Sequence, residues 1–364
     1  MRAIVTGQVG INKKEYLEGV AQLAATEGTP LGLYHVGDRM YAETPDIRPG
    51  RILDLPLSRL HNLRQSVFKD INAESANQEN VIVNTHATFR WRHGLFRAFD
   101  FDQIERFKPD LFLCIVDNVE AVHHRLHAEH TVDATLKDLL VWREEEILAT
   151  ELLALATGCR QQCYVLPRGR LRPTLQTCFR LVCRPGLRRA YLSYPMTHVA
   201  ELSETLSEIE AFRGQLAERF TTFDPGDVDE KSLLEAAMLA FKEGRDFVDG
   251  RIGGVDGSEQ TVPVSVKQIL EAAGDIDGQI YARDFQLIDQ ADMIISYIPE
   301  LTGGVPGVSS GVERELQHAY EHGKEVYVIW RPKRAPSPFI TETATRVFAS
   351  IGEASRYFDS SVKP

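Results

Sequence analysis

The sequence predicts an α/β protein of two domains, each with a parallel sheet covered by helices on both faces. Short runs rich in apolar and β-branched residues alternate along the chain with stretches of helical spacing, which is typical of parallel sheets. The length of 364 residues favours two domains, and the apolar fraction of 43% is enough for two cores. Pro185 and Gly186 interrupt the alternation, so we predict domains at residues 1–185 and 186–364.

In the first domain, five segments are predicted to be strands and three to be helices. The strand segments are short and apolar, whereas the helical segments repeat apolar residues every three or four positions. The strands are RAIVTG, PLGLYHVG, NVIVNTHAT, DLFLCIVD and QCYVLP, and the helices are KKEYLEGVAQLAATEG, LSRLHNLRQSVFKDINAE and residues 133–157.

The second domain repeats this alternation. Its predicted strands are AYLSYP, RFTTFDP, DMIISYI and EVYVIWRP, and its helices include residues 199–219 and RDFQLIDQA. Residues 224–262 are predicted to hold a helix and a glycine-rich loop, DGRIGGVDGSEQT. The last thirty residues are expected to add a helix and a short strand.

Charge and hydropathy exclude several classes of protein. A formal charge of −11 argues against a surface that binds nucleic acid or an anionic membrane. No run of about 18 apolar residues is present, so no membrane span is predicted. The first residues, MRAIVTGQVG, do not resemble a signal peptide, and we expect a cytoplasmic protein.

Neither the cysteines nor a histidine-rich stretch predicts a metal site. An odd number of cysteines argues against a disulfide framework. The flanks of the C-x3-C and C-x4-C pairs are typical of a strand and a helix, which favours buried thiols over zinc ligands. The histidines fall on one helix and the segment after it, which favours solvated side chains over a metal cluster. These residues are Cys114, Cys159, Cys163, Cys178, Cys183, His123, His124, His127 and His130.

The loop after the first strand, GQVGINKKEYL, has the spacing of a phosphate-binding loop. Gly7 and Gly10 let backbone amides face phosphate oxygens, and Lys13 can reach the outer phosphates. Asn12 replaces the second consensus glycine, which is acceptable because asparagine tolerates positive φ. Lys14 replaces the hydroxyl residue and cannot coordinate a metal. ATP is therefore the expected ligand of this loop, whereas Lys14 argues against bound Mg²⁺.

Three segments, VIVNTHATFRWRHGL, PDLFLCIVDNVEAVHHRL and WREEEILATELLALATG, resemble adenylate kinase and related nucleoside monophosphate kinases. The resemblance covers roughly the first domain and implies a P-loop fold that binds nucleotides. It implies that Asp38, Arg64 and the turn near His86 hold a monophosphate. It also implies that Arg125 and Arg143 bracket a lid, where the guanidinium fork suits phosphate.

A carboxylate in the second domain needs an explanation beyond helix formation. In GVSSGVERELQHA, Ser310 and Glu313 fit a capping box at a helix start. Val312 and Ala319 belong to the predicted buried face of that helix. Glu315 lies three residues after Val312 and four before Ala319, so it flanks the buried face. A helix cap does not account for it.

The segments AYLSYP, RDFQLIDQADMIISYI and SSGVERELQHAYEHGKEVYVI resemble the nucleoside 2-deoxyribosyltransferases and the related 2′-deoxynucleoside 5′-phosphate N-hydrolases. The resemblance covers about residues 188–332 and implies a flavodoxin- or Rossmann-like fold that needs no cofactor. It implies that Glu315 is the catalytic glutamate, Asp284 a catalytic aspartate and Tyr191 the tyrosine of the opening strand. A carboxylate beneath C1′ can stabilise oxocarbenium character, and an aspartic acid can protonate the leaving base.

Ser309 bears on the choice of substrate within this resemblance. The position six residues before the catalytic glutamate is an aspartate in the transferases that use nucleosides and a serine in the N-hydrolases that use nucleotides. Ser309, Ser310 and Gly311 would also give a helix start suited to a phosphate. The chain departs from the N-hydrolases in SYPMTHV, which is closer to the transferase form, and its loop PELTGGVPGVS is longer.

We therefore predict a nucleotide-handling enzyme. Its second domain cleaves or exchanges the N-glycosidic bond of a nucleoside 5′-phosphate, and its first domain binds nucleotide with weak or no kinase activity. Two alternatives stay open: a nucleoside monophosphate kinase with an accessory second domain, and a nucleotide-sensing defence effector that hydrolyses NAD or nucleotides. The expected partners are small nucleotides and further copies of the chain, with no membrane or nucleic acid.

Overall fold

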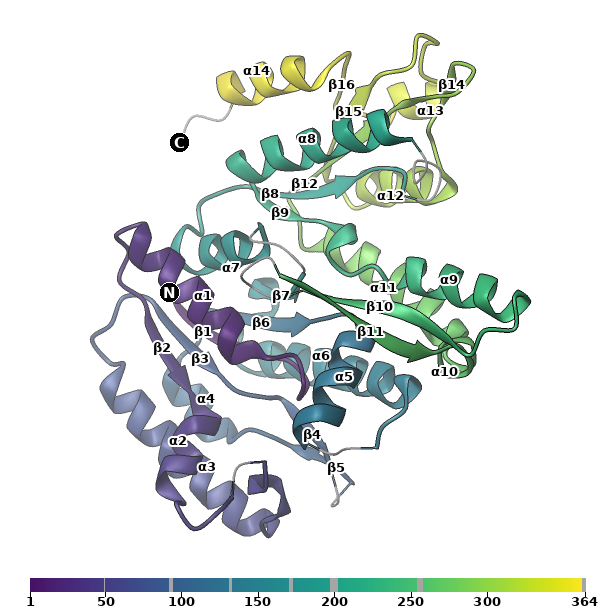
Figure 1. The fold of residues 1–364 in the computed structure, drawn as a ribbon. Coiled ribbons are helices and arrows are strands. Elements are labelled where there is room, and N and C mark those ends of the chain that lie inside the picture. The colour runs from purple at the N-terminus through teal and green to yellow at the C-terminus, as the bar shows by residue number, and fades with distance from the viewer. Residues whose placement is uncertain are drawn as a thin grey trace. The chain divides into compact units, whose positions relative to one another are not determined.

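The computed structural model describes residues 1–48, 50–91, 94–130, 133–169, 173–196, 202–253 and 258–361 (Figure 1). The chain divides into two compact units. Unit 1 consists of Met1–Pro185 and Asp227–Ile280, and unit 2 consists of Gly186–Gly226 and Tyr281–Pro364. The predicted boundary at residue 186 is therefore one of the unit boundaries, but residues 227–280 belong to the first unit and not to the second.

Unit 1 is built on a five-stranded parallel sheet with the order β2-β3-β1-β6-β7. Its strands are β1 (Arg2–Thr6), β2 (Gly32–His35), β3 (Val81–Asn84), β6 (Leu111–Val116) and β7 (Cys163–Pro167). All five were predicted. Every residue of β6 is buried, because helices cover both faces of the sheet. The strand therefore shows no alternation of polar and apolar residues.

Helices flank this sheet, with α1 and α7 packed against each other and α6 against β6 and β7 (Figure 1). The antiparallel hairpin of β4 and β5 was not predicted. The bounds are α1 (Lys13–Thr26), α2 (Val36–Glu43), α3 (Leu57–Glu74), β4 (Thr88–Trp91), β5 (Gly94–Arg97), α4 (Phe101–Phe107), α5 (Val119–His130), α6 (Leu136–Ala156) and α7 (Pro173–Cys183). Short 3₁₀ helices lie at Ile52–Asp54, Arg160–Gln162 and Pro225–Asp227.

The segment 227–280 joins unit 1 through buried contacts that no local pattern reveals. Glu230 is fully buried and accepts hydrogen bonds from the Arg143 guanidinium, at 2.6 Å, and from the Val119 amide, at 2.9 Å. The predicted glycine-rich loop is instead an antiparallel hairpin that packs on α5, and its residues 254–257 lie outside the described ranges. The segment contributes α9 (Glu230–Lys242), β10 (Phe247–Gly253), β11 (Glu259–Ser265), α10 (Val266–Glu271) and the start of α11 (Ala273–Asp289).

Unit 2 is built on a second parallel sheet with the order β16-β15-β12-β8-β9. Numbered along the chain, this order is 2-1-3-4-5, which is typical of flavodoxin-like folds. The bounds are β8 (Arg189–Ser193), α8 (Ser203–Arg219), β9 (Thr221–Phe223), β12 (Met293–Ile298), β13 (Glu300–Leu301), β14 (Val305–Pro306), α12 (Ser310–Glu321), β15 (Glu325–Trp330), α13 (Pro338–Thr341), β16 (Arg346–Phe348) and α14 (Ile351–Ser361).

The two faces of the second sheet have different roles. Ala190 and Leu192 of β8 point into an apolar core with Phe212 of α8 and Phe358 of α14. Because side chains alternate along a strand, Tyr191 and Ser193 point to the opposite face. There α12 packs on β12 and β15. None of the described helices has both the length and the apolar character that crossing a membrane requires.

Candidate functional site

Two hydroxyl groups of β8 hold the carboxylate of Glu315. The Tyr191 hydroxyl donates to Oε1 at 3.1 Å, and the Ser193 hydroxyl donates to Oε2 at 2.6 Å. Val312 and Ala319 are buried on α12, as predicted, and Glu315 reaches the sheet beside them. The unexplained carboxylate of the sequence therefore faces inward, onto the side of β8 that the α8–α14 core does not occupy.

This network lies where the order of the parallel strands reverses. β8 and β12 are neighbours in the sheet, and their helical connections leave in opposite directions. The Ser296 hydroxyl of β12 donates to the Ser193 hydroxyl at 3.3 Å, at the carboxyl end of β8. Open parallel sheets bind ligands at this switch point, beyond the carboxyl ends of the strands. Glu315 is thus placed where the fold offers a binding crevice.

Asp284 is the second carboxyl group of the site, and its charge acts on Glu315. Burial raises the pKa of Glu315, and the charge of Asp284 raises it further, whereas hydrogen bonds from Ser193 and Tyr191 oppose the change. Burial also raises the pKa of Asp284. Its Oδ1 is buried and has no hydrogen-bond partner among the described residues. The two hydroxyl donors favour the ionised form of Glu315, and both carboxyl groups of the pair have raised pKa values.

The start of α12 is capped by Ser309, not by Ser310. The Ser309 hydroxyl accepts a hydrogen bond from the Val312 amide at 3.2 Å, which corrects the predicted capping box of Ser310 and Glu313. Ser309 is half-buried, and Ser310 and Gly311 are exposed. A serine at this position adds no negative charge at the cap, and the acidic residue of the first turn is Glu313. The predicted phosphate contact at residues 309–311 stays a prediction.

The loop after β1 has the backbone of a phosphate-binding loop. Asn12 adopts φ 59°, in the left-handed region, as its replacement of glycine predicts. Gly7 has φ 139°, and a Cβ there would lie 2.5 Å from the Ile115 carbonyl, so only glycine fits. The Lys13 ammonium donates to the Gly7 carbonyl at 2.5 Å and lies 3.1 Å from His86 Nδ1. Burial lowers the pKa of Lys13 to about 8.

Glu146 supports this loop and was missed by sequence analysis. Its fully buried carboxylate accepts hydrogen bonds from the amides of Gly7, Ala87 and Thr88 at 2.7 to 2.9 Å. It thereby joins the loop after β1 to the turn after β3. A signal was available, because Glu146 lies on the apolar stripe of α6, seven residues after Leu139.

A pocket of about 190 Å³ lies beside the loop, and Asp38, Arg64 and His86 all line it. These are the residues predicted to hold a monophosphate, and the structure brings them together. Arg64 is 2% exposed, and neither of its terminal nitrogens has a hydrogen-bond partner among the described residues. Burial lowers the pKa of this guanidinium to about 10. Asp38 pairs with the exposed Lys14 at 2.7 Å.

The two arginines predicted to bracket a lid bind protein carboxylates instead. Arg125 is buried and lies 2.7 Å from Asp117, and it also donates to the Gly10 carbonyl. Arg143 forms the buried pair with Glu230. Both side chains therefore stabilise unit 1 from within, which corrects their predicted place on a lid.

The five cysteines are free thiols. Cys114 and Cys178 are buried, as expected for structural thiols, and Cys159, Cys163 and Cys183 are partly buried. Burial raises the pKa of each thiol. Within the described ranges, no group of three metal-ligating side chains includes a cysteine.

The loop, the sheet and the pocket define unit 1 as a P-loop domain of the nucleotide-binding kind. Residues 6–142 match a family model described as an AAA domain, which is less than half of the chain. No curated protein matches the chain. A 2-deoxyribosyltransferase structure from the psychrotolerant bacterium Bacillus psychrosaccharolyticus is 15% identical, with 46% of this chain and 91% of that chain covered, at a TM-score of 0.27. That similarity is too low to assign unit 2.

Proposed function

We propose that unit 2 breaks the N-glycosidic bond of a nucleoside 5′-phosphate, with Glu315 as nucleophile and Asp284 as acid. The observation that carries this proposal is the inward carboxylate of Glu315, held by Tyr191 and Ser193 at the switch point of the sheet. An oriented carboxylate that can act as nucleophile, beside a second carboxyl group that can act as acid, is the pairing that glycosidic chemistry uses.

The proposed reaction has two steps. The Glu315 carboxylate attacks C1′, the bond from C1′ to the base nitrogen breaks, and the proton of Asp284 passes to the leaving base. Asp284 then takes a proton from water, or from an acceptor base, which attacks C1′ and releases Glu315 as a carboxylate. Tyr191 and Ser193 orient Glu315 and stabilise its charge in the free enzyme.

The preference for a 5′-phosphate is supported by Ser309. The N-terminus of α12 favours anions through its dipole and its free amides, and an uncharged serine does not repel a phosphate there. Deoxyribose or ribose, and water or a second base as acceptor, are open choices in this proposal.

Unit 1 is proposed to bind ATP at the loop and a monophosphate in the pocket of Arg64, with weak phosphoryl transfer. Lys14 stands where a hydroxyl residue would hold Mg²⁺, and its ammonium instead pairs with Asp38. The second candidate function is a nucleoside monophosphate kinase, which the pocket and the match over residues 6–142 favour. Rapid, magnesium-dependent formation of ADP with a monophosphate acceptor would establish the kinase.

The test is release of free base from a panel of nucleoside monophosphates, nucleosides and NAD, followed by chromatography. Glu315→Gln should lower the rate at least ~100-fold, the size expected for loss of a catalytic group. Glu313→Gln is the matched control, because Glu313 is exposed on the same helix, and it should keep the wild-type rate. Base release by Glu315→Gln at the wild-type rate would rule out Glu315 as nucleophile. Release of base from NAD alone would favour the alternative of a nucleotide-sensing defence effector that hydrolyses NAD.

A further inference from the structure

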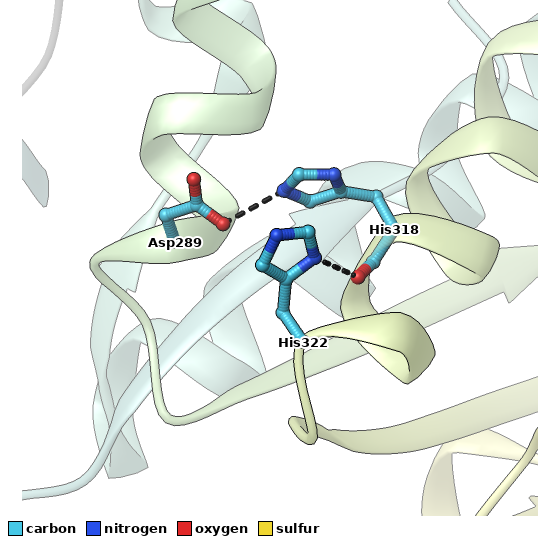
Figure 2. Close-up of side chains that lie close together, drawn as sticks. All are labelled: Asp289, His318 and His322. Atoms are coloured by element: carbon cyan, nitrogen blue, oxygen red, sulfur yellow. Dashed lines mark hydrogen bonds and ion pairs between the residues drawn. The ribbon is translucent and has the colours of Figure 1, made fainter.

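Three metal-ligating side chains converge at the ends of two helices in unit 2. Asp289 is the last residue of α11, and His318 and His322 lie one helical turn apart at the end of α12 (Figure 2). One ligand atom from each of the three lies within 4.8 Å of the others. Among the described residues, no other three His, Cys, Asp or Glu side chains meet in this way.

One imidazole presents a free nitrogen, and the other would hold its proton on Nδ1 in order to bind an ion through Nε2. His318 Nε2 lies 2.7 Å from Asp289 Oδ1. The Nδ1 of His322 donates to the His318 carbonyl at 2.8 Å, which leaves Nε2 of His322 as the nitrogen with a free lone pair. Figure 2 shows this second nitrogen on the side of His318 Nε2 and the Asp289 carboxylate. A ligating histidine is commonly held by such a bond from its other nitrogen to a backbone carbonyl.

We propose that Asp289, His318 and His322 bind Zn²⁺, with a fourth position open to water. Two imidazole nitrogens and one carboxylate oxygen are a donor set that zinc takes, and two histidines four residues apart on a helix can share one ion. With zinc bonds of about 2 Å, ligand atoms lie roughly 3.4 Å apart in a tetrahedral site. The present atoms lie 2.7 Å apart between His318 and Asp289, and all three lie within 4.8 Å of one another. Asp289 and His322 are exposed.

The surrounding charges are compatible with a bound cation. The only positive group hydrogen-bonded to this helix end in the described structure is Lys324, whose ammonium donates to the carbonyls of Asp289 and Ala291. The Asp289 carboxylate forms its hydrogen bond with His318, and its charge also acts on Lys324. An ion would replace that hydrogen bond with three bonds. Phe285 packs on the His318 ring, with centroids 4.5 Å apart, and keeps it in place.

The ion would join the end of α11 to the end of α12. These helices carry Asp284 and Glu315, but the three ligands are distinct from that carboxyl pair and from its hydroxyl donors. The site is therefore independent of the N-glycosidase proposal. It predicts a unit 2 that is more stable with zinc, because an ion that binds only the folded state stabilises it.

The test is titration of the chelator-treated full chain with Zn²⁺ by calorimetry, and with Co²⁺ by visible absorption. Wild type should bind one ion at this site and melt at a higher temperature with zinc. His322→Ala and Asp289→Asn should each weaken binding at least ~10-fold, the lower end of what even the loss of an outer partner costs. Both side chains are exposed, so the variants should fold, which their melting without zinc checks.

His127→Ala is the matched control. His123 and His127 are also four residues apart on a helix, with stacked rings 6.5 Å apart, but no third ligand joins them among the described residues. This variant should bind zinc as wild type does. Unchanged zinc affinity in His322→Ala, loss of the ion in His127→Ala alone, or no zinc binding by wild type would each overturn the proposal.

Discussion

Replacing Arg64 by methionine should stabilise unit 1 while weakening its binding of monophosphates. The guanidinium is 2% exposed, lies 5.6 Å from the Phe89 ring, and has no partner for either terminal nitrogen among the described residues. Burial lowers its pKa from 12.5 to about 10, which corresponds to roughly 3 kcal/mol by which the fold disfavours the charged form. Methionine fills a similar volume without a charge.

The two expected effects have opposite signs. Replacing a buried ion by an apolar side chain is commonly neutral or stabilising. Each 1 kcal/mol gained should raise the melting temperature by roughly 2–4 °C in a unit of this size. A hydrogen bond to a charged group contributes about 1.5–3 kcal/mol, so loss of the guanidinium should raise the Kd for a nucleoside monophosphate at least ~10-fold.

The assay pairs thermal melting with calorimetric titration of the full chain by nucleoside monophosphates. Arg39→Met is the control, because Arg39 pairs with Glu74 at 2.7 Å on the surface outside the pocket. It should change the affinity little. An Arg64→Met protein with unchanged affinity would show that the guanidinium does not meet the ligand. A marked fall in melting temperature would show that its charge is compensated in the fold.

Two further predictions concern unit 2. Burial and the charge of Asp284 raise the pKa of Glu315 to about 7, and burial raises that of Asp284 to about 6. Base release should therefore fall as the pH drops below about 7, because the nucleophile Glu315 becomes protonated. Ser193→Ala removes a hydrogen-bond donor that favours ionised Glu315, so it should shift this fall in kcat/KM to higher pH. Ser207→Ala, at an exposed position, is the control and should not shift it. A pH profile of Ser193→Ala identical to that of wild type would place Ser193 outside the site. Ser309→Asp keeps a good helix cap but puts a charge near the 5′-phosphate, a repulsion of roughly 4 kcal/mol at about 4 Å and an effective dielectric of 20. The ratio of kcat/KM for a nucleotide to that for its nucleoside should fall at least ~10-fold, and an unchanged ratio would contradict the 5′-phosphate assignment.

The parallel strands could be predicted because a strand that is buried on both faces consists almost entirely of apolar residues. Each residue of β6 is buried, so the strand appears in the sequence as one apolar run. The hairpin of β10 and β11 could not be found in this way. Its Gly250 was taken for a loop residue, yet a Cβ there would lie 2.7 Å from Val264 and 3.0 Å from Glu120. The glycine reflects close packing against α5, which depends on residues 130 positions earlier.

The candidate sites were predictable to different extents. Glu315 could be found because helical spacing leaves an inward carboxylate unexplained, and Ser193 could have been, since it shares a strand face with Tyr191. The partner of Arg143 could not, because Glu230 lies 87 residues further on and in a segment assigned to the other domain. Asp289 is the last residue of α11. Its meeting with His318 depends on how α11 packs on α12, which no spacing within one helix encodes.

Both units carry buried charged groups whose hydrogen bonding is incomplete among the described residues. Folding alone would favour an apolar side chain in place of Arg64, and would favour a partner for the buried Oδ1 of Asp284. In contrast, Arg143 and Glu230 lie equally deep and satisfy each other at 2.6 Å. The buried charges of Arg143 and Glu230 are therefore paired at a position that has no assigned ligand. Among the described residues, the fold leaves both terminal nitrogens of Arg64 without a hydrogen-bond partner in a pocket of unit 1, and Oδ1 of Asp284 without one beside Glu315 in unit 2. Groups of this kind are expected where a ligand supplies the missing partner. The partner of Arg64 would be an anion, and that of Asp284 would be the nucleobase that accepts its proton.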